Sequence, residues 1–134
     1  MEEDKKDNPI RNNQVIRILI VDDSYSSVLI TKKFLELWNY SVDIALSGEE
    51  AIAKVKNKDF NLVLMDLFMP DMDGWTTTKK IREFNQKIPI IAITASLDEH
   101  QIEKIKEYEF QDLIFKPFKP KELHDVIIKH LNRD

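Results

Sequence analysis

The 134-residue chain has no cysteine and only two glycines, Gly48 and Gly74. Without cysteine it has no thiol nucleophile, no disulfide framework and no Cys-based zinc site. Two isolated glycines cannot form a glycine-rich loop around a phosphate, so a Walker-type nucleotidase and a dinucleotide-binding fingerprint are both excluded. The composition therefore removes several common classes of enzyme before any motif is considered.

Long apolar runs and a strong excess of one charge are also missing. No run approaches the roughly 20 apolar residues of a membrane-spanning helix, and the N-terminus lacks the hydrophobic segment of a signal peptide. The formal net charge is −4, which does not favour direct binding to nucleic acid or to an anionic membrane. We therefore expect a cytoplasmic protein with neither nucleic acid nor membrane as a direct partner.

Short apolar runs alternate with helical patterns over residues 15–132, after a polar stretch over 1–14 that is expected to be a flexible N-terminal segment or linker. Strands are expected at 15–21, 41–45, 60–65, 88–94 and 112–115, and helices at 24–38, 47–55, 75–84, 96–108 and 120–131. Five successive strand–helix units predict an α/β domain, with helices on both faces of a parallel sheet.

Local signals predict where some helices begin and which way they face. Capping boxes with the pattern Ser-x-x-Glu begin at Ser47 and at Ser96, so two helices are expected to start there. In the helix over 24–38, the helical spacing predicts an inward face made of Ile30, Phe34, Leu35 and Trp38.

Polar side chains stand where four of the strands end. Asp22 and Asp23 follow the first strand, Asp66 follows the third, Thr94 ends the fourth and Lys116 follows the fifth. Because the carboxyl ends of the strands in a doubly wound sheet meet at one crevice, these residues are expected to share a site although they are far apart in the chain.

The types of residue at this edge indicate phosphoryl chemistry. Three carboxylates alone would repel one another and raise at least one pKa, and a divalent cation relieves that repulsion. Ligands that are all oxygens favour Mg²⁺. The ammonium of Lys116 suits a phosphoryl oxygen, and the hydroxyl of Thr94 offers a hydrogen-bond donor. Together these groups can steady a phosphoryl group that moves in line onto a carboxylate.

The order and spacing of these residues resemble the receiver domain of bacterial two-component response regulators, over about residues 15–132. The matching segments are Asp22-Asp23, Asp66 with Met69-Pro70 and Asp73-Gly74 after it, Thr94-Ala95, and Lys116-Pro117-Phe118. The resemblance implies a flavodoxin-like fold with strand order 2-1-3-4-5. It also implies either a single-domain regulator or the receiver of a hybrid histidine kinase.

The resemblance further implies that Asp66 accepts a phosphoryl group from the phosphohistidine of a histidine kinase or of a histidine phosphotransfer protein. Asp23, Asp66 and the backbone carbonyl of Phe68 would bind Mg²⁺ directly, and Asp22 would bind it through water. Such a domain assists its own phosphorylation and dephosphorylation and acts as a switch, so it is not a turnover enzyme.

The same resemblance assigns roles to the last two strand ends. Lys116 would contact the phosphoryl group or Asp66, and its peptide bond to Pro117 would be cis. Thr94 would bind the phosphoryl group and draw its loop inward. That movement would alter the face formed by the helix over 96–108, the strand over 112–115 and the helix over 120–131, where a downstream protein would bind.

Three departures from the family pattern concern the output and the lifetime of the phosphoryl group. Leu113 occupies a position that is usually Tyr or Phe, so the readout is expected from loop movement or from Tyr108 or Phe110. The turn over 108–111 lacks the glycine usual there. Phe68 and Ser96 occupy two positions that tune the phosphoryl lifetime, and an apolar Phe68 predicts slow autohydrolysis.

Three other functions are less consistent with the residues. A pseudo-receiver that acts through protein contacts alone would usually have lost one of the site residues. An aspartyl-phosphate phosphatase of the haloacid-dehalogenase type needs an Asp two residues after the nucleophile, where this chain has Phe68. A flavodoxin-like flavin carrier needs a phosphate-binding loop after the first strand, but Asp22 and Asp23 there would repel the phosphate.

Overall fold

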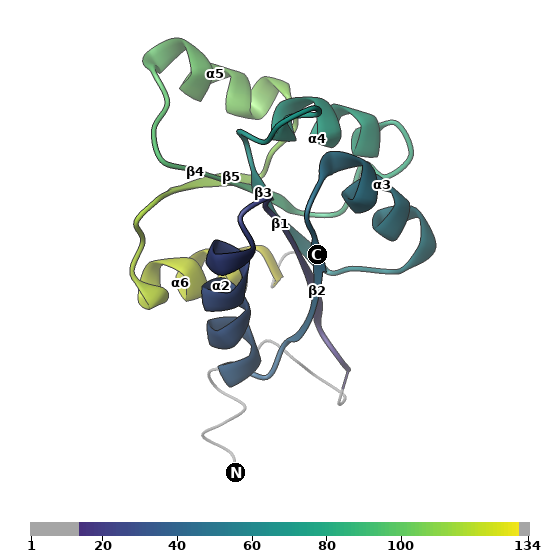
Figure 1. Cartoon of the computed structure of the whole chain (residues 1–134), viewed down its shortest axis with the longest axis vertical. Coiled ribbons are helices and arrows are strands. Elements are labelled where there is room, and N and C mark those ends of the chain that lie inside the picture. Colours follow the sequence, from purple (N-terminus) through teal and green to yellow (C-terminus); the bar gives the residue numbers. More distant parts are fainter. Residues whose placement is uncertain (1–13, 132–134) are drawn as a thin grey trace.

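A computed structural model describes residues 14–131 as a five-stranded parallel sheet with helices on both faces (Figure 1). The strands are β1 (Arg17–Val21), β2 (Ser41–Ala45), β3 (Leu62–Asp66), β4 (Ile90–Thr94) and β5 (Asp112–Phe115). The helices are α2 (Tyr25–Leu37), α3 (Gly48–Asn57), α4 (Gly74–Arg82), α5 (Glu99–Glu107) and α6 (Pro120–Leu131). The strand order is β2-β1-β3-β4-β5, which confirms the predicted flavodoxin-like α/β fold. The segment predicted to be flexible, 1–14, lies outside the described residues except for residue 14.

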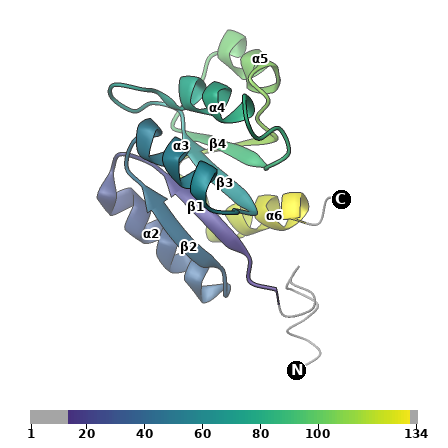
Figure 2. The same ribbon diagram turned by 90° about the vertical axis from the view of Figure 1, so that its right-hand side faces the viewer.

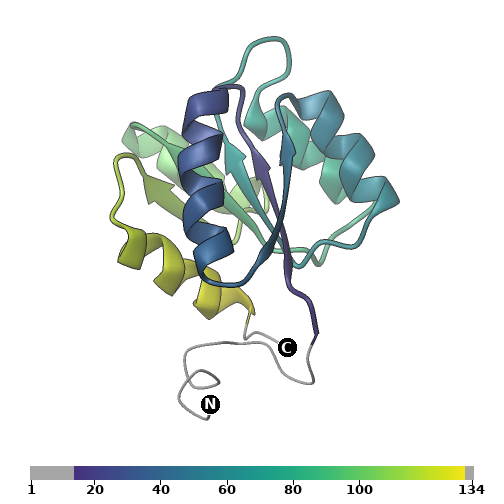
Figure 3. The ribbon, with the colours of Figure 1, turned by 60° about the horizontal axis from the view of Figure 1, so that its bottom comes forward.

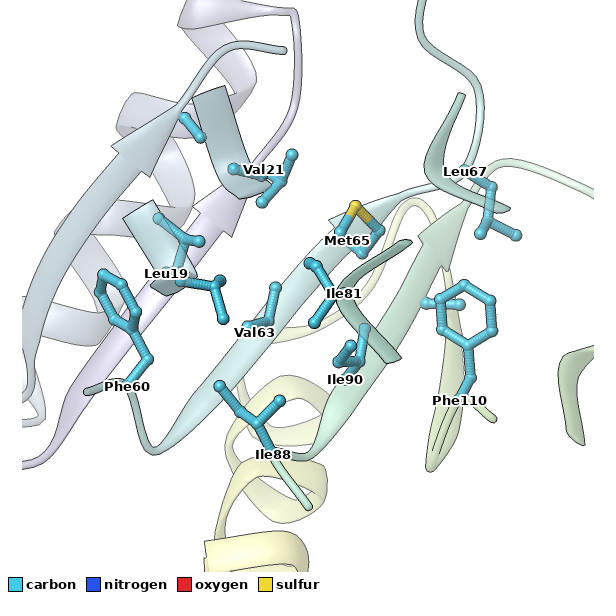
Figure 4. Packing of buried hydrophobic residues seen from close by; sticks show 14 of the residues in the cluster. Leu19, Val21, Phe60, Val63, Met65, Leu67, Ile81, Ile88, Ile90 and Phe110 are labelled. Atoms are coloured by element: carbon cyan, nitrogen blue, oxygen red, sulfur yellow. The ribbon is translucent and has the colours of Figure 1, made fainter. Parts of the chain in front are cut away.

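Apolar side chains form one core on each face of the sheet. Helices α3, α4 and α5 cover one face and α2 and α6 the other, as the side view in Figure 2 shows. Alternate residues of each central strand point to opposite faces, so Val63 joins the first core and Leu64 the second. The first core, part of which Figure 4 shows, continues into Ile81 of α4 and Phe110 before β5. The central strands are therefore buried on both sides, which explains their continuous apolar runs.

The beginnings of the helices confirm one predicted cap and correct another. The side chain of Ser47 accepts a hydrogen bond from the amide of Glu50, as expected for the start of α3. Helix α5 begins after Asp98 and not at Ser96, so that prediction was wrong. Asp98 accepts from the amide of Gln101, whose side chain accepts in turn from the amide of Asp98. This reciprocal pair is a capping box two residues further along the chain.

The predicted inward face of α2 is only partly correct. Leu35 is fully buried, but Ile30 is 61% exposed. Val28, seven residues before Leu35, occupies the other buried position, because residues seven apart lie on the same side of a helix.

Among the described residues, no helix is both long and apolar enough to cross a membrane.

The register of the sheet brings the strand ends together. Val21 pairs with Met65 across β1 and β3, Asp66 pairs with Ile93 across β3 and β4, and Thr94 pairs with Phe115 across β4 and β5. The strands point to the same edge, as Figure 3 shows for β1, β2 and β3. The residues that follow each strand therefore meet above that edge.

Candidate functional site

Three carboxylates meet at the carboxyl edge of the sheet. Each of Asp22, Asp23 and Asp66 offers an oxygen, and these oxygens all lie within 4.8 Å of one another. Asp22 is 6% exposed, Asp66 is partly buried and Asp23 is exposed. The structure thus brings together the acidic residues that the sequence placed after β1 and β3. A set of three carboxylate oxygens, one of them almost fully buried, suits a hard cation such as Mg²⁺.

Asp22 is held by two donors on either side of its carboxylate. Its Oδ1 accepts from the amide of Ser24 at 2.9 Å, and its Oδ2 accepts from Nζ of Lys116 at 3.1 Å. The amide of Lys116 donates to the carbonyl of Thr94 at 2.8 Å, which places the lysine beside β4. The ammonium of Lys116 thus pairs with Asp22, and its positive charge also acts on Asp66, whereas its predicted contact with a phosphoryl group stays a prediction. The peptide bond between Lys116 and Pro117 is cis, as predicted.

Asp66 is a carboxyl group that resists ionisation. Burial raises the pKa of Asp66 to about 6, and the negative charge of Asp22 also raises it. The positive charge of Lys116 and a hydrogen bond from the amide of Phe68 oppose this rise. A carboxylate whose charge is poorly solvated is stabilised by a nearby cation and remains a good nucleophile.

Thr94 presents a hydroxyl group to the same edge. The residue ends β4 and is 1% exposed, and its Oγ1 finds no hydrogen-bond partner among the residues that the structure describes. A buried polar atom without a partner costs about 1–3 kcal/mol, so this hydroxyl would gain free energy from an acceptor bound at the site. This hydroxyl is suited to donate to an oxygen of a group bound at Asp66.

The loop after Asp66 is folded back against the strand that precedes it. The amide of Gly74 donates to the carbonyl of Leu67 at 2.9 Å, and a Cβ on Gly74 would collide with the carbonyl oxygen of Asp66. Asp73 caps α4 by accepting from the amide of Thr76 at 2.8 Å. Glycine is therefore required because helix α4 begins in direct contact with the backbone of Asp66.

Of two apolar features of the site, Phe68 was expected from the sequence and the cleft beside Lys116 was not. Phe68 is 51% exposed beside Asp66. A cleft of about 450 Å³ runs from Asp66 and Lys116 between α2 and the segment that leads into α6. Its apolar walls are formed by Ile20, Ile30, Phe34, Leu64, Ile93 and Phe118. The sequence predicted that Ile30 faces the core, and only the structure shows that it lines this cleft instead.

The fold and the site together define a phosphoacceptor type of domain, namely a doubly wound sheet with an acidic triad and a lysine at its carboxyl edge. Residues 18–128 match the response regulator receiver domain. The chain belongs to this family, the phosphoacceptor domains of two-component signalling.

Relatives of known sequence place such domains in larger proteins. The chain is 35% identical over 131 residues to the sensor protein EvgS of Escherichia coli, covering 98% of this chain and 11% of that protein. It is 40% identical over 117 residues to the transcriptional regulatory protein ZraR of Salmonella typhimurium, covering 87% and 26%. The chain thus spans about a quarter or less of the length of these curated relatives.

Solved structures of similar fold are receiver domains. A CheY-like receiver domain protein from Methanospirillum hungatei superimposes with a TM-score of 0.85 at 32% identity, covering 89% of this chain and 95% of that one. The receiver domain of the sensor histidine kinase PA1611 from Pseudomonas aeruginosa gives a TM-score of 0.83 at 26% identity, covering 90% and 100%. In that structure a magnesium ion is coordinated in the active-site cleft.

Proposed function

We propose that Asp66 accepts a phosphoryl group from a phosphohistidine in a Mg²⁺-dependent reaction, and that the domain then changes conformation. The observation that supports this proposal most strongly is the convergence of three carboxylates, Asp22, Asp23 and Asp66, with the ammonium of Lys116. The hydroxyl of Thr94, which has no partner within residues 14–131, ends the neighbouring strand. The donor is a histidine kinase or a histidine phosphotransfer protein, because a similar receiver domain belongs to the sensor histidine kinase PA1611.

The transfer uses groups that are already in place. A carboxylate oxygen of Asp66 attacks phosphorus as the P–N bond of the phosphohistidine breaks, and the departing imidazole nitrogen keeps the electron pair. Asp23, Asp66 and the backbone carbonyl of Phe68 would hold Mg²⁺, with Asp22 acting through water. The bound ion would supply positive charge to the phosphoryl oxygens and to the carboxylates.

Lys116 and Thr94 complete the binding of the phosphoryl group in this proposal. Lys116 exchanges its contact with Asp22 for one with a phosphoryl oxygen, because a phosphoryl group brings more negative charge than the carboxylate. Thr94 donates its free hydroxyl to another oxygen and draws the loop after β4 inward. The domain assists its own phosphorylation and dephosphorylation but is a switch and not a turnover enzyme.

Cellular context is also part of the proposal. A phosphohistidine donor is made with ATP inside the cell, so the domain is cytoplasmic. The downstream partner is a protein that binds the face formed by α5, β5 and α6. Residues 15–132 form the receiver, either as a single-domain regulator or within a hybrid histidine kinase.

Intact-mass measurement after incubation with Mg²⁺ and acetyl phosphate tests this function. We expect one added phosphate, lost in Asp66→Asn and on chelation of the metal. Asp71→Asn is a matched control, because Asp71 is exposed in the neighbouring loop and outside the triad. Absence of labelling by acetyl phosphate and by phosphoramidate would favour the pseudo-receiver, which signals by protein contact alone.

A further inference from the structure

Helix α4 is attached at its beginning to the backbone of the proposed phosphoacceptor. The amide of Gly74 donates to the carbonyl of Leu67, and a Cβ at position 74 would collide with the carbonyl oxygen of Asp66. There is no room for a side chain at this contact, so a shift of the loop after Asp66 must move the first turn of α4.

The next residue of α4 packs on the turn between α5 and β5. The ring of Trp75 lies edge-to-face with Tyr108, at 5.3 Å and 70°, and with Phe110, at 5.7 Å and 88°. Tyr108 is the C-cap of α5, and Phe110 is a buried residue two positions before β5. These are favourable aromatic geometries, and they fix Trp75 against both sides of the turn.

The last residue of α4 holds the same turn by hydrogen bonds. Arg82 is 4% exposed, and it donates through Nε and Nη2 to the carbonyl of Glu109 at 3.1 and 2.8 Å. Its Nη2 also donates to Oε1 of Gln111 at 2.7 Å, and that same oxygen accepts from the amide of Ile90. Glu109 has a φ of 66°, a left-handed conformation that usually requires glycine. Arg82 therefore stabilises the glycine-free turn that the sequence contains.

Trp75 and Arg82 lie on one side of α4. They are seven residues apart, so they share a face and stand about 10 Å from each other along the helix axis. The beginning of α4 contacts the backbone of Asp66, while Trp75 and Arg82 both contact the turn over 108–111. Leu113 follows in β5 and lines a cleft of about 480 Å³ between α5 and β5, together with Ile102 and Phe110.

We propose that α4 is the rigid link that transmits phosphorylation to the α5–β5 face, with Trp75 and Arg82 as its coupling residues. This inference rests on the proposed function of Asp66. Binding at Asp66 moves the loop over 67–73 and tilts α4. The tilt displaces Phe110 and reshapes the cleft beside Leu113. The aromatic contacts of Trp75 thus perform the task that an inward-moving ring at position 113 would perform.

Hydrogen exchange of the full chain, with and without Mg²⁺ and beryllofluoride, tests the link. In the wild type we expect the amides over 67–74 and those over 106–113 both to change their exchange rates, the latter by about fivefold. In Tyr108→Leu the first change should remain while the second falls below about twofold. Tyr108 is only partly buried, so this variant should fold, and Trp75→Phe provides a second variant that keeps a ring.

Trp38→Phe is the matched control. Like Trp75→Phe, this variant replaces an indole that contacts another ring. Trp38 stacks on His124, however, and lies on the opposite face of the sheet. We expect it to keep both exchange responses, and Trp75 becomes its sole tryptophan and a fluorescent reporter of the turn. Melting temperatures verify that every variant is folded.

The possible outcomes separate the two proposals. If the amides over 67–74 respond but those over 106–113 do not, or if both responses survive in Tyr108→Leu and Trp75→Phe, the link through α4 is wrong while the function of Asp66 stands. If neither segment responds in the wild type and acetyl phosphate adds no mass, the proposed function fails and the link fails with it.

Discussion

Replacement of Asp66 by Asn should stabilise the protein at neutral pH in the absence of metal. The carboxylate of Asp66 is desolvated and faces Asp22, and these two effects raise its pKa from 3.8 to about 6. An amide removes the unfavourable charge and can still accept the hydrogen bond from Phe68. The expected change is therefore a gain in the free energy of unfolding, although the residue is proposed to be essential for function.

The magnitude follows from the pKa. A rise from 3.8 to about 6 corresponds to at most about 3 kcal/mol, at about 1.4 kcal/mol per unit. Asp66 is only partly buried, so solvent screening reduces the expected gain to about 1–2 kcal/mol. Well above pH 6 the folded state must hold an ionised Asp66, so there the free energy of unfolding of the wild type is lowered by the full amount. The penalty disappears as the pH falls from about 6 to about 4, where the unfolded carboxyl also binds a proton.

Urea unfolding at pH 7.5 and at pH 4.5, with EDTA or with Mg²⁺, measures this effect. In EDTA at pH 7.5 Asp66→Asn should be more stable than the wild type, and at pH 4.5 the difference should shrink. Saturating Mg²⁺ should stabilise the wild type, by about 2.7 kcal/mol at a hundred times the dissociation constant, and should stabilise the variant much less. A variant that is less stable than the wild type in EDTA at pH 7.5, with Asp71→Asn neutral, would refute the reasoning.

Three further changes have distinct expected results. Gly74→Ala should lower the free energy of unfolding by more than about 2 kcal/mol and reduce acetyl phosphate labelling, because the new methyl group collides with the carbonyl of Asp66. A melting temperature equal to that of the wild type would contradict this contact. Thr94→Val should leave the free energy of unfolding unchanged or raise it by up to about 1 kcal/mol, because the buried hydroxyl has no partner in the described part of the chain. A clear loss of stability in urea unfolding would mean that the hydroxyl is bonded. Phe68→Asn should shorten the half-life of phospho-Asp66, because the exposed ring is expected to obstruct the attacking water. Intact-mass measurement of the phosphorylated fraction over time, after the donor is removed, gives this half-life, and an unchanged value counts against the obstruction.

Much of the fold could be predicted because local chemistry sets it. Continuous runs of four apolar residues in β1, β3 and β4 are buried on both faces of the sheet, and all five strands were recognisable within two residues of their ends. The start of α5 was not, because Ser96 and Asp98 both begin acceptable capping patterns. The path of the chain after β4 decides between them. Ile30 likewise matches a helical apolar stripe, but the neighbouring layers leave it exposed.

The sequence by itself determined which chemical groups reach the edge of the sheet, because parallel strands end together and Asp22, Asp23, Asp66, Thr94 and Lys116 each stand at a strand end. Only the tertiary structure decided how these groups interact. The ammonium of Lys116 lies on Asp22 and not on Asp66, and burial raises the pKa of Asp66. Both results depend on distances and desolvation across residues far apart in the chain, which strand register and packing set and local sequence does not contain.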